Sequence, residues 1–423
     1  RVSPNILEEH PFVRHLVRYG VPALILIFYV TASLHFDYTP DSTFATLNAL
    51  HSSHIDSLWT ALLALATVFN IDVLLAAKVF SLLFACFGIL ISYLIANEVL
   101  NDHLLAFCVT ISVSMQAWLI QLAPTGSGLS LALFLSLVTI FFLLRNEYII
   151  AGIFAGLASL VAWQAAGLLF VMMLDAYINA VDKNRSVKMI ASIALVFAGV
   201  VLPWILYSLY VGRLLVPTME VLSIVPTFSL QVSFEILLLV GAMFVGVVLV
   251  LMRDKSALNT QIAILLWIAI ASFSHHQMFA LALPLIIIYI FFSVQRLSQA
   301  FGKRNLSYIV AVLLATLILA YNQMLALPAA ENSMNSAVAQ MDEMKAIAMW
   351  LTTNVNDDES VAVPEQHQGL IQYWGERSVG DNNSRFVVSR MNEVAGYELV
   401  FDPSKENVEL LGSPAHYKVW RRK

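Results

Sequence analysis

The sequence predicts a mainly α-helical, polytopic membrane protein, with about eleven transmembrane helices, one interfacial helix and a small C-terminal α/β domain outside the membrane. Hydrophobic residues fill 59% of the 423 positions and charged residues only 12%. The mean hydropathy is +0.78, whereas only about half of an ordinary soluble domain is apolar. Apolar runs also recur as far as Leu327, most of them near the roughly 20 residues that a helix needs to cross a bilayer.

The first apolar run, 20–34, follows a charged leader and lacks a small-residue cleavage site, so we expect a retained first span. A polar loop, His35–His54, comes next. The run 55–70 is short for a crossing and predicts an interfacial or re-entrant helix. Full spans are expected at 72–97, 104–122, 128–144, 148–162, 164–181, 188–210, 232–251, 257–274, 276–294 and 306–327.

Lysine and arginine, which concentrate in cytoplasmic loops, predict the orientation. The loops expected inside hold Arg14, Arg18, Arg145, Lys183, Arg185, Lys188, Arg253, Lys255, Arg296, Lys303 and Arg304. The opposite loops hold almost nothing basic except Arg213. This asymmetry requires that the 55–70 helix does not cross. We therefore expect the loops 35–70 and 211–231 and the C-terminal segment on the outer face of the cytoplasmic (plasma) membrane.

The composition changes to a soluble pattern from Ala329, which predicts two domains, a membrane domain of 1–328 and a soluble extracytoplasmic domain of 329–423. The segment MDEMKAIAMWLTTNV predicts an amphipathic helix, and SVAVPE, RFVVS and YELVF predict short strands. The apolar residues at helical spacing are Met341, Met344, Ile347, Ala348 and Leu351.

Two carboxylates in the first outer loop, Asp37 and Asp41, are the candidate catalytic groups. A carboxylate at the membrane boundary can accept a proton from an acceptor hydroxyl. Asp41, directly after Pro40, is equally well suited to cap the helix that STFATLNAL predicts. Asp37 has the simpler alternative of an exposed, solvated acid.

Lys78 and Arg213 are the candidate phosphate-binding residues on the same outer side. Lys78 lies inside the predicted span 72–97, where an ionisable group usually faces a partner or a polar cavity. Its long stem can instead carry the ammonium group to the interface. Arg213 can bind a phosphate with two hydrogen bonds, and a lipid head group is an equally ordinary partner.

Histidines also gather on this side: His51 and His54 end the acidic loop, and His275 and His276 precede or begin a span. We include His54, His275 and His276 as candidate substrate-binding residues. A cluster of His and Asp can bind a divalent metal, which stays open as a cofactor. No metal-ligand spacing such as H-E-x-x-H supports it, and no metal ligands are predicted. No basic cluster accompanies aromatic residues, so nucleic acid is not an expected partner.

Several segments, in order, resemble the GT-C superfamily of integral membrane glycosyltransferases, which use polyprenyl-phosphate sugars. They are FDYTPDSTFATLNAL, HIDSLWTALLALATVFNIDVLLAAKVFSLLF, AGIFAGLASLVAWQAAGLLF, VVLPWILYSLYVGRLLVPT, HHQMFALALPLIIIY and KAIAMWLTTNVNDDESVAVPEQHQGLIQYWGERSVGDN. Through this resemblance Asp41, or else Asp37, corresponds to the catalytic acid, and Lys78 and Arg213 to donor-phosphate contacts. It implies a lipid-linked sugar donor, membrane lipid and polyprenyl-phosphate sugar as partners, and no certain cofactor.

The sequence also departs from that superfamily. Trp163 and Gln164 stand where many members have a positive residue, and Gln277 and Met278 follow His276 where an arginine often occurs. Fewer arginines would weaken phosphate binding. Two alternatives to a glycosyltransferase that acts on a hydroxyl therefore stay open. One is a catalytically inactive scaffold or lipid-binding subunit of a larger membrane complex. The other is an oligosaccharyltransferase-like enzyme, because the segment GERSVGDNNS resembles the oligosaccharyltransferase branch of the superfamily.

Overall fold

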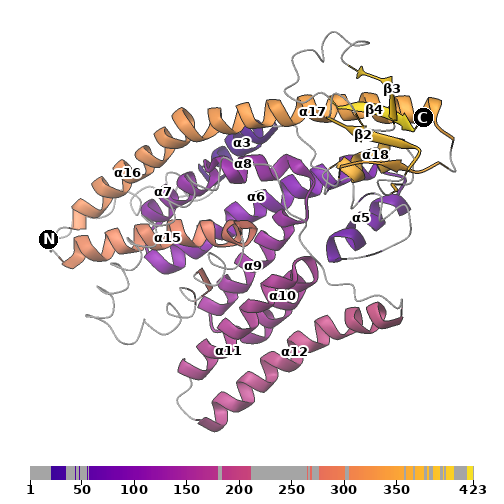
Figure 1. Cartoon of the computed structure of the whole chain (residues 1–423). Coiled ribbons are helices and arrows are strands. Elements are labelled where there is room, and N and C mark those ends of the chain that lie inside the picture. The colour runs from indigo at the N-terminus through magenta and orange to yellow at the C-terminus, as the bar shows by residue number, and fades with distance from the viewer. Residues whose placement is uncertain are drawn as a thin grey trace.

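The computed structural model describes residues 21–34, 43, 47, 55, 57–179, 183–210, 264, 267–268, 276–300, 304–356, 359–364, 367–375, 379–380, 384–390, 394, 397–403 and 417–422. Within these residues the chain is mainly helical and carries one small β-sheet near its C-terminus (Figure 1).

Most predicted spans correspond to helices. They are α3 (Val21–Leu34), α6 (Val73–Leu100), α7 (His103–Ser114) with α8 (Ala117–Leu122), α9 (Leu129–Leu144), α10 (Tyr148–Val161), α11 (Gly167–Asn179), α12 (Lys183–Tyr210), α15 (His276–Ala300) and α16 (Arg304–Tyr321). Among the described residues, four helices are long and apolar enough to cross a membrane alone, and a fifth span results if the bent α7–α8 pair counts as one. The chain is thus an integral membrane protein, and the number of eleven spans stays a prediction. The predicted spans 232–251 and 257–274 lie outside the described residues, apart from 264 and 267–268.

Helix α9 is the centre of the bundle, because nearly all of its side chains are buried. Its neighbours are α6 and α10. Gly88 of α6 faces α9, since a Cβ at that position would lie 3.8 Å from a methyl carbon of Leu133, an ordinary van der Waals distance. At the C-terminal ends of α6 and α9, Arg145 and Glu98 form an ion pair of 3.6 Å, so these two helices run in the same direction.

Helix α10 faces α12 with two glycines spaced four apart, Gly152 and Gly156, and the approach is close at Gly156. A Cβ on Gly156 would lie only 2.9 Å from the Cβ of Val200, and a Cβ on Gly152 would lie 3.6 Å from a methyl carbon of Val196. Small residues at this spacing let helix backbones approach each other inside a membrane. The Gly-rich segment AGIFAG therefore forms a helix-packing surface.

We expect Gly156→Leu to destabilise the protein, because the new side chain must displace Val200. Overpacking of this kind costs about 1–3 kcal/mol. The check is the midpoint of thermal unfolding in detergent micelles. Gly199→Leu, on α12, is the matched control, since nothing described lies within 4 Å of a Cβ there. Equal midpoints for the two variants would contradict the packing role of Gly156.

The helix predicted at 55–70 is α5 (Leu58–Val68), 11 residues long. At about 1.5 Å per residue it is too short to cross the roughly 30 Å hydrocarbon core. Ser57 and Thr60 form a capping box, in which each side chain bonds the other residue's backbone N–H. The buried side chain of Trp59 faces the rest of the protein.

The C-terminal part begins without a break in the backbone helix. Helix α16 continues through the π-helical turn η4 (Asn322–Ala326) into α17 (Leu327–Asn354). The boundary predicted between 328 and 329 therefore lies within a continuous helix, and the division into two domains stays a prediction. The amphipathic face of α17 is confirmed by the burial of Met344, Ile347, Ala348 and Leu351.

The sheet packs against α17 and contains β1 (Val361–Ala362), β2 (Phe386–Ser389), β3 (Tyr397–Phe401) and β4 (Lys418–Arg422) in the order β1-β2-β4-β3. β1 pairs parallel to β2, and β4 pairs antiparallel to both β2 and β3. The three predicted strands are confirmed, and β4 is additional. Helix α18 (Gln368–Gly375) lies beside α17 (Figure 1).

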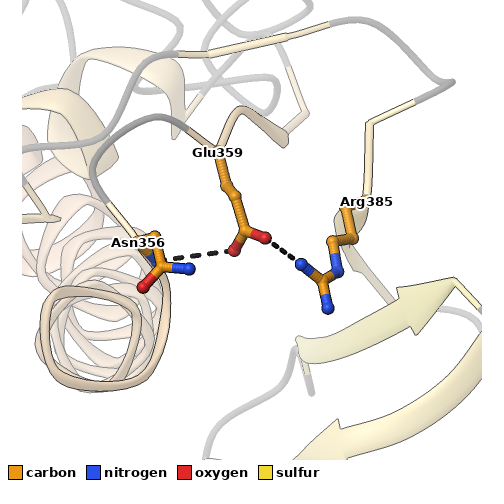
Figure 2. Close-up of polar contacts among 3 residues, drawn as sticks. All are labelled: Asn356, Glu359 and Arg385. Carbon is orange, nitrogen blue, oxygen red and sulfur yellow. Dashed lines mark hydrogen bonds and ion pairs between the residues drawn. The ribbon is translucent and has the colours of Figure 1, made fainter.

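Figure 2 shows the polar contact that joins the end of α17 to the sheet. Glu359 accepts a hydrogen bond from the backbone N–H of Asn356 at 3.4 Å and forms an ion pair with Arg385, which precedes β2. The backbone carbonyl of Arg385 in turn accepts the N–H of Arg422 in β4 at 2.8 Å. These contacts fix the sheet relative to the helix that leads into it.

A buried polar cluster stabilises the C-terminal unit, which consists of α17, α18 and the sheet. The ring of Tyr417 contacts the imidazole of His367, whose Nε2 lies 3.0 Å from the Tyr417 hydroxyl. The Tyr417 N–H donates to Glu343 at 2.8 Å. Burial, with the positive charge of Arg390, lowers the pKa of His367 from 6.5 to about 4. His367 is therefore neutral in the folded protein at neutral pH.

We expect the stability of this unit to fall as the pH drops from 6.5 to about 4. In that window the unfolded chain binds a proton at His367 and the folded chain does not, so protons favour unfolding. The effect is at most about 3 kcal/mol. Unfolding of the full chain, followed by tryptophan fluorescence across this pH range, measures it. His367→Gln should flatten the slope, and an unchanged slope in His367→Gln would refute this origin.

Candidate functional site

Three segments far apart in the sequence meet at one end of the bundle, at a junction formed by Thr43, Ala77 and the turn 123–128. The hydroxyl of Thr43 donates to the backbone carbonyl of Thr125 at 3.0 Å. Thr43 and Thr125 are both 2% exposed, and Ala77 is fully buried. Thr43, the start of α6 and the turn before α9 therefore touch one another here.

The sequence APTGSG explains the local shape of the turn. Pro124 lies in a short 3-10 helix, η2 (Ala123–Thr125), and Gly126 follows with φ +72°. Glycine adopts this left-handed conformation without a steric cost. A Cβ on Gly126 would lie 3.3 Å from both the Ala77 Cβ and the Thr43 Cγ2. Gly126 thus allows both neighbours to approach the turn.

Helix α5 packs on the same turn. A Cβ on Gly128 would lie 2.9 Å from Cγ of Trp59, so the indole occupies the space above a glycine backbone. The Thr125 hydroxyl donates to the Leu122 carbonyl at 2.7 Å and approaches the Ser127 hydroxyl at 3.1 Å. The turn is therefore fixed by its own hydrogen bonds as well as by its neighbours.

Lys78 follows Ala77 directly on α6 and is half-buried. One turn further along the helix, the buried Ser81 hydroxyl lies 3.0 Å from the Ser130 hydroxyl of α9. Lys78 thus follows a junction residue directly in the chain and lies one helical turn before the Ser81–Ser130 contact. Among the predicted site residues it is the one whose side-chain surroundings the structure describes.

Asp37, Asp41, His54, Arg213 and His275 lie outside the described residues. His276 is the first residue of α15. Chain geometry still limits Asp41, because two virtual bonds of 3.8 Å keep its Cα within about 7 Å of that of Thr43. Thr43 and the turn 123–128 were missed as site elements, although Pro124 and the glycines Gly126 and Gly128 signal a turn.

The C-terminal unit lies at this end of the bundle. Burial, with the negative charge of Asp72, raises the pKa of Tyr373 on α18 above its ordinary value. Asp72 caps the N-terminus of α6 by accepting the Leu75 N–H at 3.0 Å. Trp374, next to Tyr373, contacts the ammonium group of Lys345 at 5.7 Å. Helix α18 therefore stands close to the start of α6, less than two turns before Lys78.

A buried acid lies at the opposite end of the bundle. Asp175 of α11 is fully buried and accepts hydrogen bonds from the Tyr148 hydroxyl at 2.7 Å and from Asn179 at 2.9 Å. Its hydrogen-bond partners explain its burial, so its role is structural. A cavity of about 520 Å³ lies nearby, between the first residues of α10 and Met189 and Ile193 of α12.

In the part of the chain that the structure describes, no group of three or more histidine, cysteine, aspartate or glutamate side chains is arranged to bind a metal ion. The two cysteines, Cys86 and Cys108, are both unpaired and half-buried. No metal centre is therefore assigned among these residues.

No protein-family model matches the chain, and no curated protein matches it. Solved structures do match. ArnT from Cupriavidus metallidurans, bound to undecaprenyl phosphate, superposes with a TM-score of 0.62 at 11% sequence identity, over 95% of this chain and 98% of ArnT. The likeness to ArnT therefore extends over nearly the whole of both chains.

An archaeal enzyme also matches. The oligosaccharyltransferase AglB from Archaeoglobus fulgidus, in complex with an inhibitory peptide and a dolichol-phosphate, superposes with a TM-score of 0.57 at 12% identity, over 86% of this chain and 64% of AglB. The same organism's oligosaccharyltransferase with zinc and sulfate gives 0.54 at 13% identity, over 84% of this chain and 62% of that one. This chain thus spans less than two-thirds of those two chains.

Both ArnT and AglB are GT-C glycosyltransferases. At identities of 11% to 13% the likeness establishes the fold and leaves the activity to be argued from the site. The resemblance stated from the sequence is confirmed at the level of the fold: the chain has the GT-C fold in a divergent form, and the number of spans stays a prediction.

Proposed function

We propose that this protein is a membrane glycosyltransferase that moves a sugar from a polyprenyl-phosphate carrier to an acceptor hydroxyl at the outer face of the cytoplasmic membrane. The observation that carries the proposal is the junction at the end of the bundle. It holds Thr43, two residues after Asp41, against α6 next to Lys78. An acid and a cation in one region are what transfer from a lipid phosphate requires.

In the proposed reaction Asp41 accepts the proton of the acceptor hydroxyl, and Asp37 is the second choice for this role. The hydroxyl oxygen attacks the anomeric carbon, and the bond from that carbon to the phosphate oxygen breaks. The polyprenyl phosphate leaves with the electron pair. Lys78 and Arg213 stabilise the charge on this leaving group. His54, His275 and His276 bind substrate hydroxyl or phosphate oxygens.

The match with ArnT supports a lipid-phosphate donor, because that protein was solved with undecaprenyl phosphate and shares the fold along nearly its whole length. AglB, solved with a dolichol-phosphate, supports the same class of carrier. An oligosaccharyltransferase-like reaction, with a peptide acceptor, is the closest alternative, since AglB was also solved with a peptide. The two proposed reactions differ in the acceptor and share the lipid-phosphate donor.

A catalytically inactive, GT-C-like scaffold or lipid-binding subunit of a larger membrane complex is the second candidate. It is favoured by Trp163 and Gln164 of η3 (Trp163–Ala166), where many GT-C members have a positive residue. The Trp163 side chain is 51% exposed. Without a cation at this position, phosphate binding depends more on Lys78 and Arg213.

The test is turnover by the purified protein in lipid nanodiscs. Polyprenyl-phosphate sugars are prepared from cells that make this protein, with a label in the sugar. They are incubated with the purified protein and with lipid or peptide acceptors. We expect labelled product and free polyprenyl phosphate in equal amounts, with the lipid acceptor preferred. Product with the peptide alone would favour the oligosaccharyltransferase alternative. The scaffold hypothesis would be supported if no polyprenyl phosphate is released and the protein purifies from native membranes with a stoichiometric partner.

A further inference from the structure

The contact between the first outer loop and the turn 123–128 has a role in the reaction as well as in the fold. We propose that Thr43 is a positioning residue: its hydrogen bond to the Thr125 carbonyl fixes the acidic loop relative to the helix that carries Lys78. This inference rests on the proposed function, because it assigns the contact to the assembly of that site.

The geometry makes this contact suited to the role. Thr43 and Leu47, four residues apart in the chain, are each helical and buried. The Thr43 hydroxyl reaches the Thr125 carbonyl at 3.0 Å across a separation of 82 residues. This single bond therefore joins the segment that follows Asp41 to the opposite side of the junction.

The partner of Thr43 is a rigid element. Thr125 lies in η2, its own hydroxyl bonds the Leu122 carbonyl, and Gly126 has φ +72°. The turn also touches Ala77, one residue before Lys78, and α5 through Gly128. A displacement of Thr43 thus moves the acidic loop relative to Lys78, whereas the turn itself is fixed from several sides.

The position of Asp41 depends on this contact through a short tether. Only Ser42 separates Asp41 from Thr43, so the two Cα atoms are within about 7 Å of each other. Misplacement of a catalytic group by about 1 Å lowers a rate by roughly 100-fold, even when the change is remote from the reacting atoms. Loss of the Thr43 bond should therefore lower kcat and have little effect on the donor KM.

Thr43→Val keeps the shape of the side chain and removes its hydroxyl, whereas Thr43→Ser keeps the hydroxyl. Thr139→Val is the matched control, because Thr139 is also fully buried and its hydroxyl bonds a carbonyl of its own helix, that of Leu135, at 2.9 Å. Gly126→Ala is a second variant that displaces the turn rather than the loop, since alanine is strained at φ +72° and meets Thr43 at 3.3 Å.

Two readouts on the full chain in nanodiscs decide the inference. Hydrogen–deuterium exchange over residues 35–54 should rise in Thr43→Val and in Gly126→Ala, and stay near wild type in Thr43→Ser and Thr139→Val. With the polyprenyl-phosphate sugar that the wild type uses, kcat should fall by about 10 to 100-fold in Thr43→Val and be restored in Thr43→Ser.

The inference is overturned if Thr43→Val exchanges like the wild type over 35–54, if Thr43→Ser behaves like Thr43→Val, or if exchange rises along the whole chain. Its failure is separable from that of the proposed function. A wild type that transfers no sugar, combined with exchange that rises only over 35–54 in Thr43→Val, would refute the transferase and retain Thr43 as the residue that positions the acidic loop. Should Thr43→Val fail to fold, Gly126→Ala decides by the same two readouts.

Discussion

Asp41→Asn lowers the rate of sugar transfer by about 100 to 10,000-fold, the range that a positioned general base contributes. The amide has nearly the same shape as the carboxylate but cannot accept the acceptor's proton, so binding of the polyprenyl-phosphate donor is expected to persist. The measurement is kcat for release of polyprenyl phosphate, with donor affinity determined in parallel.

Asp37→Asn is the comparison that separates the two acids of the loop. If Asp41 is the base, Asp37→Asn has a smaller effect on kcat than Asp41→Asn, and both variants unfold at the wild-type temperature. A larger loss in Asp37→Asn would transfer the role of base to Asp37. Full turnover in both variants would remove the acidic loop from the reaction.

Lys78→Gln weakens the binding of polyprenyl phosphate by about 10 to 100-fold, because a hydrogen bond to a charged group contributes about 1.5–3 kcal/mol. Lys78 directly follows Ala77, which packs against Gly126 at the junction. Titration of undecaprenyl phosphate into the protein in detergent micelles measures the change.

Two further variants make this result specific to the position. Lys78→Arg keeps the positive charge and should retain most of the affinity. Lys188→Gln removes an exposed cation from the first part of α12, outside the junction, and should leave binding unchanged. Equal losses in Lys78→Gln and Lys188→Gln would show a general effect of charge and would contradict a phosphate site at Lys78.

Much of the fold can be predicted from the sequence, because the apolar runs and capping residues that indicate a helix lie within or next to that helix. The apolar run around Lys78 became α6, which begins at the cap residue Asp72 and ends at Asn101 with φ 50°. The apolar spacing of Met344, Ile347 and Leu351 predicts the buried face of α17. A local pattern of apolar residues is therefore sufficient to predict an element that buries one of its faces.

Features that depend on remote partners could not be predicted this way. Strand β4 has a basic sequence in which Val419 and Trp420 are adjacent and both buried, so it lacks the alternation of a surface strand. It is stabilised instead by pairing on both edges, with β2 and β3.

The candidate site is likewise only partly encoded in local sequence. Lys78 was identified as a charge within an apolar run, but Thr43 is an ordinary threonine in a polar loop. Its importance comes from the Thr125 carbonyl, 82 residues away. Nothing in the spacing of either residue specifies that contact, since long-range packing decides it.

The most direct test of the central claim uses the unmodified protein. Undecaprenyl phosphate carrying a photoreactive group next to its phosphate is bound to the full chain in nanodiscs, irradiated, and the adducts are located by mass spectrometry. We expect adducts in the loop 35–54, at the start of α6 and in the turn 123–128, all abolished by excess undecaprenyl phosphate. Adducts confined to the cavity between α10 and α12, or adducts that excess lipid does not displace, would contradict a lipid-phosphate site at the acidic loop and Lys78.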